Sequence, residues 1–451
     1  MPSDNNLKAK TAIFMILLTI VVICAISCRE FPTEPDYNIY LAAEDVFCTS
    51  VTLKVTLPDS GNVNQFALDR NDSTIVTLTC NDDDTLVTDE DLTPDTDYTY
   101  RVRFLKDGKT KAESEPVTVH TMSTTSHEFV WEIDTLGLYG SNLNDVWIVD
   151  ENNIWVVGYI RVDDPDSSFD GTGQETFNAA KWDGEQWNLM RIINSSPVFS
   201  VLYFREDDIW MVSYGYPVHW NGNSWKLYPF HDMGIDASAL SLWGTSSSNL
   251  YFVGLEGSIV HYDGSTFMKM ESGTQVDLVD IHGTPDSKHV FVCGYNYMGE
   301  LSGQSVVLEL KNGQWERLLS SSGYYGDIEN GDYGRYMAVR VFGNMAYFTT
   351  GATDLLMFNY KTRNLTYIPK NTTILGSKQL ESMDGNYFND IMFVSPLDLV
   401  FHYNGASYFQ DSYLRDSFPY DLYYLKVRLK GDIAAVFGTT IMNGFIAIGH
   451  R

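Results

Sequence analysis

The chain has 451 residues and a formal net charge of −29, because 59 acidic residues stand against 30 lysines and arginines. So acidic a surface repels phosphate backbones and anionic headgroups, which excludes nucleic-acid binding and polybasic membrane binding. Hydrophobic residues make up 44% of the chain and aromatic residues 14%. This content is enough to build a core and suits pleated sheets, so wholesale disorder is excluded as well.

The amino terminus has the pattern of a secretory signal. Lys8 and Lys10 precede an apolar run, Thr11–Ile26, which ends in small residues. The run holds about 16 residues, fewer than the roughly 20 that span a bilayer, so a signal is favoured over a transmembrane anchor. Its end, Ala25–Cys28, resembles a bacterial lipobox.

That resemblance implies cleavage before Cys28, which would become the lipid-modified first residue. An ordinary secreted or anchored protein remains the alternative. Arg29 and Glu30 follow the cysteine, with no aspartate to indicate inner-membrane retention, so we expect the cell envelope, at the outer membrane or cell surface. We therefore expect a signal peptide at 1–27 and a tether at 28–36, with the lipid anchor as the only membrane contact.

Three cysteines remain after cleavage: Cys48, Cys80 and Cys293. A Cys48–Cys80 disulfide is permitted outside the cytoplasm, but the spacing does not decide whether it forms. Cys293 lies inside an apolar run, which predicts a buried structural thiol. Because the chain has no CxxC pair, neither a zinc site nor a thioredoxin-like role is indicated.

Residues 37–122 hold short alternating runs separated by turns, as in a β-sandwich. Within them, the segment Leu92–Tyr98 (LTPDTDY) resembles the L-x-P-x-T-x-Y signature of fibronectin type III domains. The resemblance implies that Tyr98 forms the tyrosine corner, with its hydroxyl bonded to backbone just upstream. The tryptophan usual in the second strand is missing, since Lys54 and Val55 occupy that neighbourhood. Such domains act as spacers or adhesion units.

Residues 123–451 repeat a pattern of apolar strands and an aromatic-[Asp/Asn]-Gly turn followed by another aromatic. The turn accepts the positive φ angles of a tight hairpin, so each unit predicts four antiparallel strands, the blade of a β-propeller. The clearest units contain Leu143–Trp147, Ile154–Gly158 and Lys181–Trp187; then Val201–Phe204, Ile209–Ser213 and His219–Trp225; then Leu242–Gly244, Leu250–Gly254 and His261–Phe267.

Four less regular units follow, and the last lacks a fourth strand. The segment Glu128–Ile133, which precedes the first unit, is expected to supply it and so close the ring. The predicted fold class is therefore all-β, with a fibronectin type III-like β-sandwich followed by a seven-bladed β-propeller. Six or eight blades remain alternatives.

The mature chain as a whole resembles a family of bacterial secreted lipoproteins. These combine a lipobox, a fibronectin-like module and a W-G…D-[VL]-[WY]-x-V-G…H-[YW]-[DN]-G repeat. Some of them carry the name glucosyltransferase, but no residues here support that activity. The resemblance thus implies an architecture and leaves the activity open.

His219, His261 and His402 each precede an aromatic-[Asp/Asn]-Gly turn. Equivalent positions of different blades lie far apart, so we expect a hydrogen bond within each blade and no shared metal. The aromatics after the turns are expected to pack between blades (Trp187, Trp225, Phe267, Trp315).

The acidic runs Asp82–Asp84 and Asp163–Asp166 lack the spacing of a calcium loop and are expected to be solvated. The chain contains no HExxH, GxSxG, P-loop or dinucleotide-binding pattern. We therefore expect no cofactor, no metal and no catalytic residue that the sequence can name.

Three insertions interrupt the repeats: Ile160–Phe177, Tyr295–Gln304 and Ser320–Tyr336. Long loops on a rigid ring often carry function, and tyrosines among small residues suit sugar stacking or protein contact. The alternative is a solvated excursion. The candidate ligand-binding residues, all in the last insertion, are Tyr324, Tyr325, Tyr333 and Tyr336.

The sequence favours a cell-envelope lipoprotein whose propeller binds an extracellular protein or glycan without catalysis. The rival is a carbohydrate-active enzyme, a hydrolase or lyase, that uses an acid pair at the propeller channel. A purely structural scaffold is a third possibility. Two carboxylates within about 10 Å in a deep pocket would favour the enzyme, and a shallow aromatic loop face would favour binding.

Overall fold

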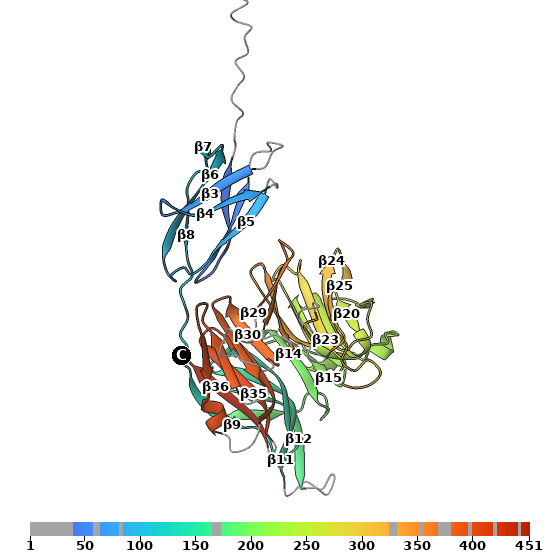
Figure 1. The fold of residues 1–451 in the computed structure, drawn as a ribbon. Helices are drawn as coiled ribbons and strands as arrows, with labels where there is room; N and C mark the ends of the chain where they lie inside the picture. Colours follow the sequence, from blue (N-terminus) through green and yellow to red (C-terminus); the bar gives the residue numbers. More distant parts are fainter. Residues whose placement is uncertain are drawn as a thin grey trace, which may run out of the picture. The chain divides into compact units, whose positions relative to one another are not determined.

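Strands dominate the computed structural model of the chain, which confirms the predicted all-β class (Figure 1). The helical elements among the described residues are short: α2 (Tyr413–Ser417), η1 (Phe230–Met233) and η2 (Leu255–Gly257). None of these is long and apolar enough to cross a membrane. The structure describes residues 39–56, 64–80, 84–164, 173–323, 332–351, 355–368, 380–395, 399–417, 422–440 and 443–451.

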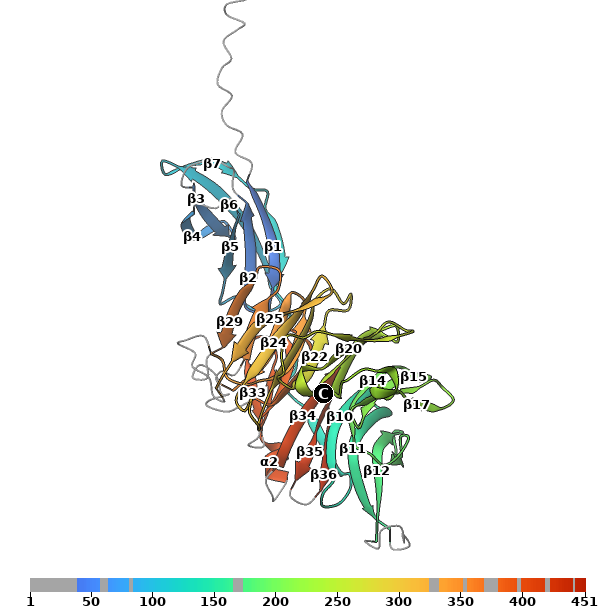
Figure 2. The same ribbon diagram turned by 90° about the vertical axis from the view of Figure 1, so that its right-hand side faces the viewer.

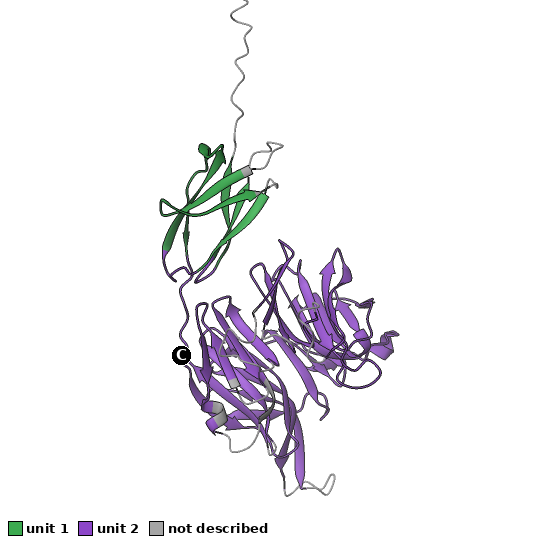
Figure 3. Ribbon diagram, in the orientation of Figure 1, with its two compact units in different colours: residues 1–46, 51–90, 97–120 green, residues 47–50, 91–96, 121–451 purple. Residues whose placement is uncertain are grey.

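The chain divides into two compact units (Figure 3). The first contains the described residues up to Val46 together with Val51–Glu90 and Asp97–His120. The second contains Thr121–Arg451 and two short earlier segments, Phe47–Ser50 and Asp91–Thr96.

The first unit consists of two antiparallel sheets. Its strands are β1 (Tyr40–Val46), β2 (Val51–Thr56), β3 (Asn64–Arg70), β4 (Ser73–Cys80), β5 (Asp84–Asp89), β6 (Asp97–Lys106), β7 (Lys109–Glu113) and β8 (Val117–His120). One sheet has the order β1-β2-β5, and the other has the order β4-β3-β6-β7, with β8 also paired to β6. In β2, the fully buried Val51, Leu53 and Val55 alternate with more exposed residues, as the period of a strand with one core face requires.

A buried polar group fixes the end of β5 in this sandwich. The hydroxyl of Tyr100 donates to Asp89 Oδ2 at 2.7 Å, and Arg70 Nη1 lies 3.0 Å from both oxygens of the same carboxylate. Burial, followed by the neighbouring carboxylate, raises the pKa of Tyr100 far above its usual range, so this phenol stays a donor. Tyr98 is half-buried, with the Arg70 guanidinium 5.7 Å from its ring centroid. Its role as a tyrosine corner stays a prediction.

The two cysteines whose side chains are described are free and buried. The Sγ of Cys48 lies 3.4 Å from the carbonyl oxygen of Ser123, so Cys48 forms no disulfide with Cys80. Cys293 is fully buried, and its burial raises the pKa of the thiol well above the usual value. Cys293 is therefore an inert structural thiol, as predicted.

In the second unit, each sequence repeat folds into one four-stranded antiparallel sheet, and the described residues hold seven of them. The first strands of successive sheets lie next to one another. The first four sheets are β10 (Asn142–Asp150), β11 (Asn153–Asp163), β12 (Gln174–Trp182) and β13 (Trp187–Met190); β14 (Val198–Arg205), β15 (Asp208–Ser213), β16 (Tyr216–Trp220) and β17 (Trp225–Leu227); β18 (Ala239–Ser246), β19 (Asn249–Gly254), β20 (Ile259–Tyr262) and β21 (Phe267–Met270); and β22 (Leu278–Gly283), β23 (Val290–Tyr295), β24 (Ser305–Lys311) and β25 (Gln314–Ser321).

The last sheet takes its fourth strand from the segment that precedes the first sheet. The last three sheets are β26 (Tyr336–Phe342), β27 (Met345–Thr350), β28 (Leu355–Asn359) and β29 (Asn364–Ile368); β30 (Ser382–Tyr387), β31 (Asp390–Ser395), β32 (Leu399–Tyr403) and β33 (Tyr408–Asp411); and β34 (Leu422–Lys430), β35 (Ile433–Thr440), β36 (Gly444–His450) and β9 (Val130–Thr135). The red last sheet lies beside the teal first sheet in both ribbon views, so the sheets form a closed ring (Figures 1 and 2).

The hairpin turns are determined by the local sequence. In the turn Asp263-Gly264-Ser265-Thr266, Asp263 Oδ1 accepts the backbone N–H groups of Ser265 and Thr266, both at 2.8 Å. These bonds, led by the one from Thr266, hold the pKa of Asp263 well below its usual range. Gly264 adopts φ of 93°, which a side chain would strain. A short sequence thus fixes the register of each outer hairpin.

The aromatics after the turns pack between neighbouring sheets, as predicted. Trp315, for example, belongs to a cluster that joins the third sheet to the fourth and includes Trp243 and Ile281. Phe267 lies against residues of the second and third sheets, including Leu202 and Phe252.

Trp131 is the anchor of the closing strand. It lies opposite Gly449 in the ladder between β9 and β36, and a Cβ on Gly449 would come within 2.8 Å of its ring. The ring packs into a cluster with Met392 and Val427 of the last two sheets. Its Nε1 donates to Asp411 Oδ2 at 2.7 Å.

Trp131→Ala should therefore lower the free energy of unfolding by about 3–5 kcal/mol, the usual cost of truncating a buried tryptophan. The neighbouring Val130 is 73% exposed, so Val130→Ala should change stability by less than about 0.5 kcal/mol. Urea unfolding followed by tryptophan fluorescence compares the two variants. Equal effects would show that β9 does not hold the ring closed.

Candidate functional site

The first strands of all seven sheets line a channel along the axis of the ring, which contains two pockets. The wide pocket has a volume of about 580 Å³ and is lined by Asp145, Ser200, Ser241, Asp280, Arg335, Glu381 and Lys426, among others. The narrow pocket has a volume of about 270 Å³ and is lined by Trp147, Trp243, His282, Asp384 and Lys430, among others. Both pockets are bounded by Ser241, Asp280, Arg340 and Arg428, which form a common floor.

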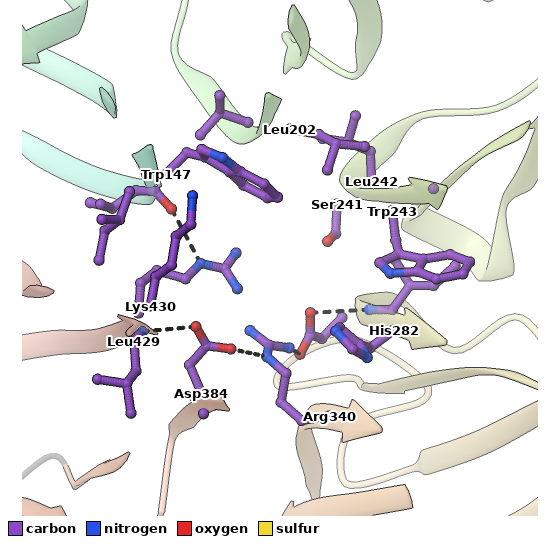
Figure 4. A pocket seen from close by; sticks show the side chains of 18 residues that line it. Trp147, Leu202, Ser241, Leu242, Trp243, His282, Arg340, Asp384, Leu429 and Lys430 are labelled. Carbon is purple, nitrogen blue, oxygen red and sulfur yellow. Dashed lines mark hydrogen bonds and ion pairs between the residues drawn. The ribbon is translucent and has the colours of Figure 1, made fainter. Parts of the chain in front are cut away.

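Arg340 of β26 is the centre of this floor. Its side chain is 5% exposed and bridges two carboxylates from different sheets: Nη1 lies 2.8 Å from Asp280 Oδ2, and Nε lies 2.6 Å from Asp384 Oδ1 (Figure 4). Burial acts to lower the pKa of Arg340, but the two carboxylates outweigh it and raise the pKa further above its usual range. Arg340 is therefore a permanent charge that ties the fourth, fifth and sixth sheets together.

The half-buried Arg428 and the buried Asp145 form a second ion pair, between the seventh and first sheets. Arg428 Nη2 donates to Asp145 Oδ1 at 2.7 Å, and the other oxygen accepts the Ser200 hydroxyl at 2.9 Å. Burial acts to raise the pKa of Asp145, but the charges of Arg428 and Lys426 outweigh it and keep the pKa low. Asp145 is thus a stable anion near neutral pH.

Hydrogen bonds occupy every oxygen of these three aspartates. Besides the arginine contacts, Asp145 accepts the N–H groups of its own sheet and the next, and Asp280 and Asp384 accept N–H groups of the fifth and seventh sheets. The remaining oxygen of Asp280 accepts the N–H of Ile281 at 3.1 Å. Each of these oxygens therefore accepts at least one hydrogen bond that helps to hold the ring together.

Two other charged groups of the wide pocket, Lys426 and Glu381, make fewer hydrogen bonds. Lys426 Nζ donates to the carbonyl oxygen of Asn144 at 2.8 Å. The ammonium is open to the channel, but protein surrounds it and lowers its pKa by desolvation, which Asp145 partly opposes. Glu381 accepts no side-chain hydrogen bond among the described residues. Burial raises the pKa of Glu381, while Arg335 and Lys426 act in the opposite direction.

Aromatic residues of the fourth sheet border the same pocket. Tyr295, the last residue of β23, and Tyr297, in the segment that follows it, line the pocket wall; the sequence marked this region as the insertion Tyr295–Gln304. The guanidinium of Arg335 lies 5.2 Å from the centroid of the Tyr295 ring. Tyr297 and the adjacent Met298 are 64% and 77% exposed, so they present a large apolar surface at the rim.

Of the four candidate tyrosines in the other insertion, the structure describes Tyr333 and Tyr336. Tyr324 and Tyr325 lie outside the described residues. Tyr333 is partly buried, with its ring centroid 6.3 Å from that of Tyr367. Tyr336 is fully buried in β26 and packs among Val339 and Phe348, so its expected role as a contact residue is corrected to one in the core.

The three repeat histidines each make the predicted bond inside their own sheet. Nε2 of His219, His261 and His402 lies 2.8–2.9 Å from Asp208, Asn249 and Asp390, respectively. In the part of the chain that the structure describes, no three His, Cys, Asp or Glu side chains gather as a metal site would require.

The narrow pocket has a different character. Two indole rings, Trp147 and Trp243, face it together with His282 (Figure 4). His282 Nδ1 accepts the backbone N–H of Val341 at 3.1 Å, which requires a neutral ring. Burial and then the charges of Arg340 and Arg428 hold the pKa of His282 well below its usual value. This end of the channel is therefore uncharged at its histidine and largely structural.

The sequence did contain a signal for the axial residues. Arg340 and Arg428 stand within strands that are otherwise rich in apolar residues, and Asp280 interrupts Val279–Ile281. A charge on the innermost strand of a blade must point into the channel or be paired. The residues span Asp145 to Arg428, however, so no local motif unites them.

Comparison with known proteins shows the fold but no family. No protein-family profile matches the chain, and no curated protein matches it significantly. The structure of Ycf48 bound to a D1 peptide matches with a TM-score of 0.51 and 14% identity, over 71% of this chain and 95% of that one. The chain therefore contains a β-propeller.

Two further solved structures match less well. The propeller domain of Cps50 (Swd1) from Myceliophteria thermophila has a TM-score of 0.46 and 9% identity, over 72% of this chain and 99% of that one. The extracellular domain of a one-component system from B. thetaiotaomicron has a TM-score of 0.48 and 11% identity, over 71% of this chain and 40% of that one.

Arg428→Met should leave Asp145 as a buried, poorly compensated charge and cost about 2–4 kcal/mol of stability at pH 7. In the wild type, the low pKa of Asp145 contributes stability that is lost as pH falls through that pKa. In the variant, burial raises the pKa of the Asp145 carboxyl. This carboxyl is therefore already neutral at the pH at which the wild-type carboxyl becomes protonated. The difference between the two proteins should therefore be smaller at pH 4 than at pH 7.

Urea unfolding at pH 7 and pH 4 measures this difference. Arg205→Met, which removes an exposed ion pair with Asp207, is the matched control and should have little effect at either pH. A loss that is the same at both pH values would show that Arg428 stabilises the ring by packing alone.

Proposed function

We propose that this protein is a cell-envelope lipoprotein whose seven-bladed propeller binds an extracellular protein partner at the wide pocket, without catalysis. In this proposal Cys28 carries the lipid, residues 28–36 form the tether, and a fibronectin type III-like domain at 37–122 acts as a spacer. The propeller occupies residues 123–451.

The occupation of the aspartate oxygens carries the non-catalytic part of this proposal. Glycosidic bond cleavage requires two carboxyl groups that face the bond, one of them able to exchange a proton. In the wide pocket, Asp145 and Asp280 accept hydrogen bonds from arginines and backbone N–H groups that join the sheets. Glu381 is the remaining carboxyl group that lines the wide pocket. A single carboxyl group does not supply the two that glycosidic bond cleavage requires.

Glu381 is nevertheless the observation that favours the rival enzyme. Its pKa is raised by burial, as in a general acid. If the rival were correct, Glu381→Gln would abolish the release of reducing sugar from envelope polysaccharides, and the wild type would release it. We expect no release from either protein.

The rim favours a protein partner. Exposed Tyr297 and Met298 stand beside a charged pocket, and protein interfaces combine such aromatic and methionine side chains with a few charged groups. Rigid propellers also serve as platforms for peptides, as the Ycf48 complex with a D1 peptide illustrates.

Tyr297→Ala with Met298→Ala should weaken partner binding about tenfold or more, because central aromatic contacts contribute at least about 1–2 kcal/mol. Full-length protein reconstituted in vesicles is tested against a displayed peptide library and a glycan array. Tyr214→Ala, at a similarly exposed tyrosine (71%), is the control and should bind as the wild type does.

Retention of peptides by the wild type and the control, with loss in the double variant, supports the proposal. Selective binding of glycans without peptides, or release of a product, would contradict it.

A further inference from the structure

The wide pocket is far less acidic than the chain as a whole. Four cationic groups line it (Arg335, Arg340, Lys426 and Arg428) against three carboxyl groups (Asp145, Asp280 and Glu381), and Asp384 of the floor also pairs with Arg340, so the positive and acidic groups are equal in number. In the whole chain, acids outnumber bases 59 to 30. Arg340 and Arg428 are engaged by aspartates, whereas Lys426 forms no ion pair among the described residues. A cation in a balanced pocket inside an acidic protein makes this pocket a more favourable place for an anionic group than the surface around it.

The pocket also presents hydrogen-bond donors. An ammonium has three N–H bonds, and Lys426 uses one of them on the carbonyl oxygen of Asn144. The hydroxyl groups of Ser241, in the third sheet, and Ser382, in the sixth, line the same pocket and make no side-chain hydrogen bond among the described residues. Ammonium and hydroxyl donors fit the oxygens of a carboxylate.

The two pockets meet at the charged floor. Arg340 with Asp280 and Asp384, and Arg428 with Asp145, lie where they meet, and the narrow pocket beyond is the smaller one, with a volume of about 270 Å³. The wide pocket is therefore the part of the channel with more room for the end of a polypeptide or a side chain. A volume of about 580 Å³ is within the range of small-ligand sites and exceeds what one carboxylate fills.

The remaining wall is apolar. Phe199, Leu240 and Met337 line the pocket and are only half-buried, so they offer apolar surface to a ligand. Together with Tyr295 and Tyr297 at the rim, these three residues form an apolar surface that we call the apolar collar. It lies beside the cationic groups of the pocket. A uronic acid would meet few hydroxyl partners on such a wall, whereas an apolar side chain next to a carboxylate fits both parts.

We propose that the wide pocket, the site of the proposed function, binds the free carboxyl end of a polypeptide chain. Lys426 holds the terminal carboxylate, with Ser241 and Ser382 as further donors, and the apolar collar holds the last side chains. Capture of a terminal carboxylate by clustered donors is a recurring mode of peptide recognition. Glu381 competes with the ligand for the same cations and tunes its affinity.

The test uses the full-length protein in detergent and two pools of random octapeptides, one with a free carboxyl terminus and one amidated. We expect the wild type to retain the free pool and to bind the amidated pool at least about tenfold more weakly, since a charge-assisted hydrogen bond contributes about that factor. Lys426→Met should abolish the preference.

Lys430→Met is the matched control, because it lies on the same strand and also caps a carbonyl oxygen, that of Val149 at 2.8 Å, but it faces the narrow pocket. It should bind as the wild type does. Glu381→Gln keeps the shape of the side chain and removes the competing charge, so it should tighten binding of the free pool several-fold. A merely structural role for Glu381 would not produce this gain.

Equal binding of both pools, unchanged by Lys426→Met, would overturn the carboxylate proposal and leave the propeller a peptide-binding protein. Retention of neither pool, together with binding of a glycan or of nothing, would overturn this proposal and the proposed protein partner alike. Loss of folding in Lys426→Met does not decide the matter, because Glu381→Gln and the amidated pool test the site in folded protein.

Discussion

The buried ion pairs at the axis are the constraint on which the rest of this propeller depends. Seven innermost strands converge on one channel, and their inward side chains must either pack or pair. Arg340 holds two carboxylates from neighbouring sheets, and Arg428 holds a third across the junction of the last and first sheets. The same contacts join the sheets and line both pockets of the channel, so one set of bonds serves the fold and shapes the candidate site.

The two ends of the channel therefore differ in their residues and in what they can bind. Below the floor, the indole rings and the neutral His282 make a compact, structural end. Above it, Lys426 and Glu381 face open space beside a rim of exposed side chains. The wide pocket thus holds cationic and acidic groups in balance, inside a chain whose overall charge is strongly negative. Because of this contrast, the outer surface would repel anionic groups, and the channel would accept one.

Much of the fold was predictable because its signals are local. The Asp-Gly and Asn-Gly turns form their hydrogen bonds within four residues, as at Asp263, and each fixes a hairpin without help from the rest of the chain. The histidine bonds also follow from the repeat, since His219 and Asp208 belong to adjacent strands of one sheet, β16 and β15. The closing strand was inferred by counting, because the last repeat lacked a partner that Val130–Thr135 provides.

The site was far less predictable, because its residues come one or two at a time from distant repeats. Lys426 and Glu381 have no local motif, and only the closed ring brings them together. Composition of a loop was a poor guide to exposure: Tyr336 resembles its neighbours in sequence but begins a core strand, and burial removes it from any surface. The insertion at Tyr295 gave a better indication, since its strand ends at the channel mouth.

The most direct measurement is a crystal structure of the protein with a retained octapeptide from the free-carboxyl pool. The account predicts a terminal carboxylate oxygen within hydrogen-bond distance of Lys426 Nζ, and the last apolar side chain against Phe199, Leu240 and Met337. A peptide bound in the narrow pocket, or on the outer face of the sheets with the wide pocket empty, would contradict it.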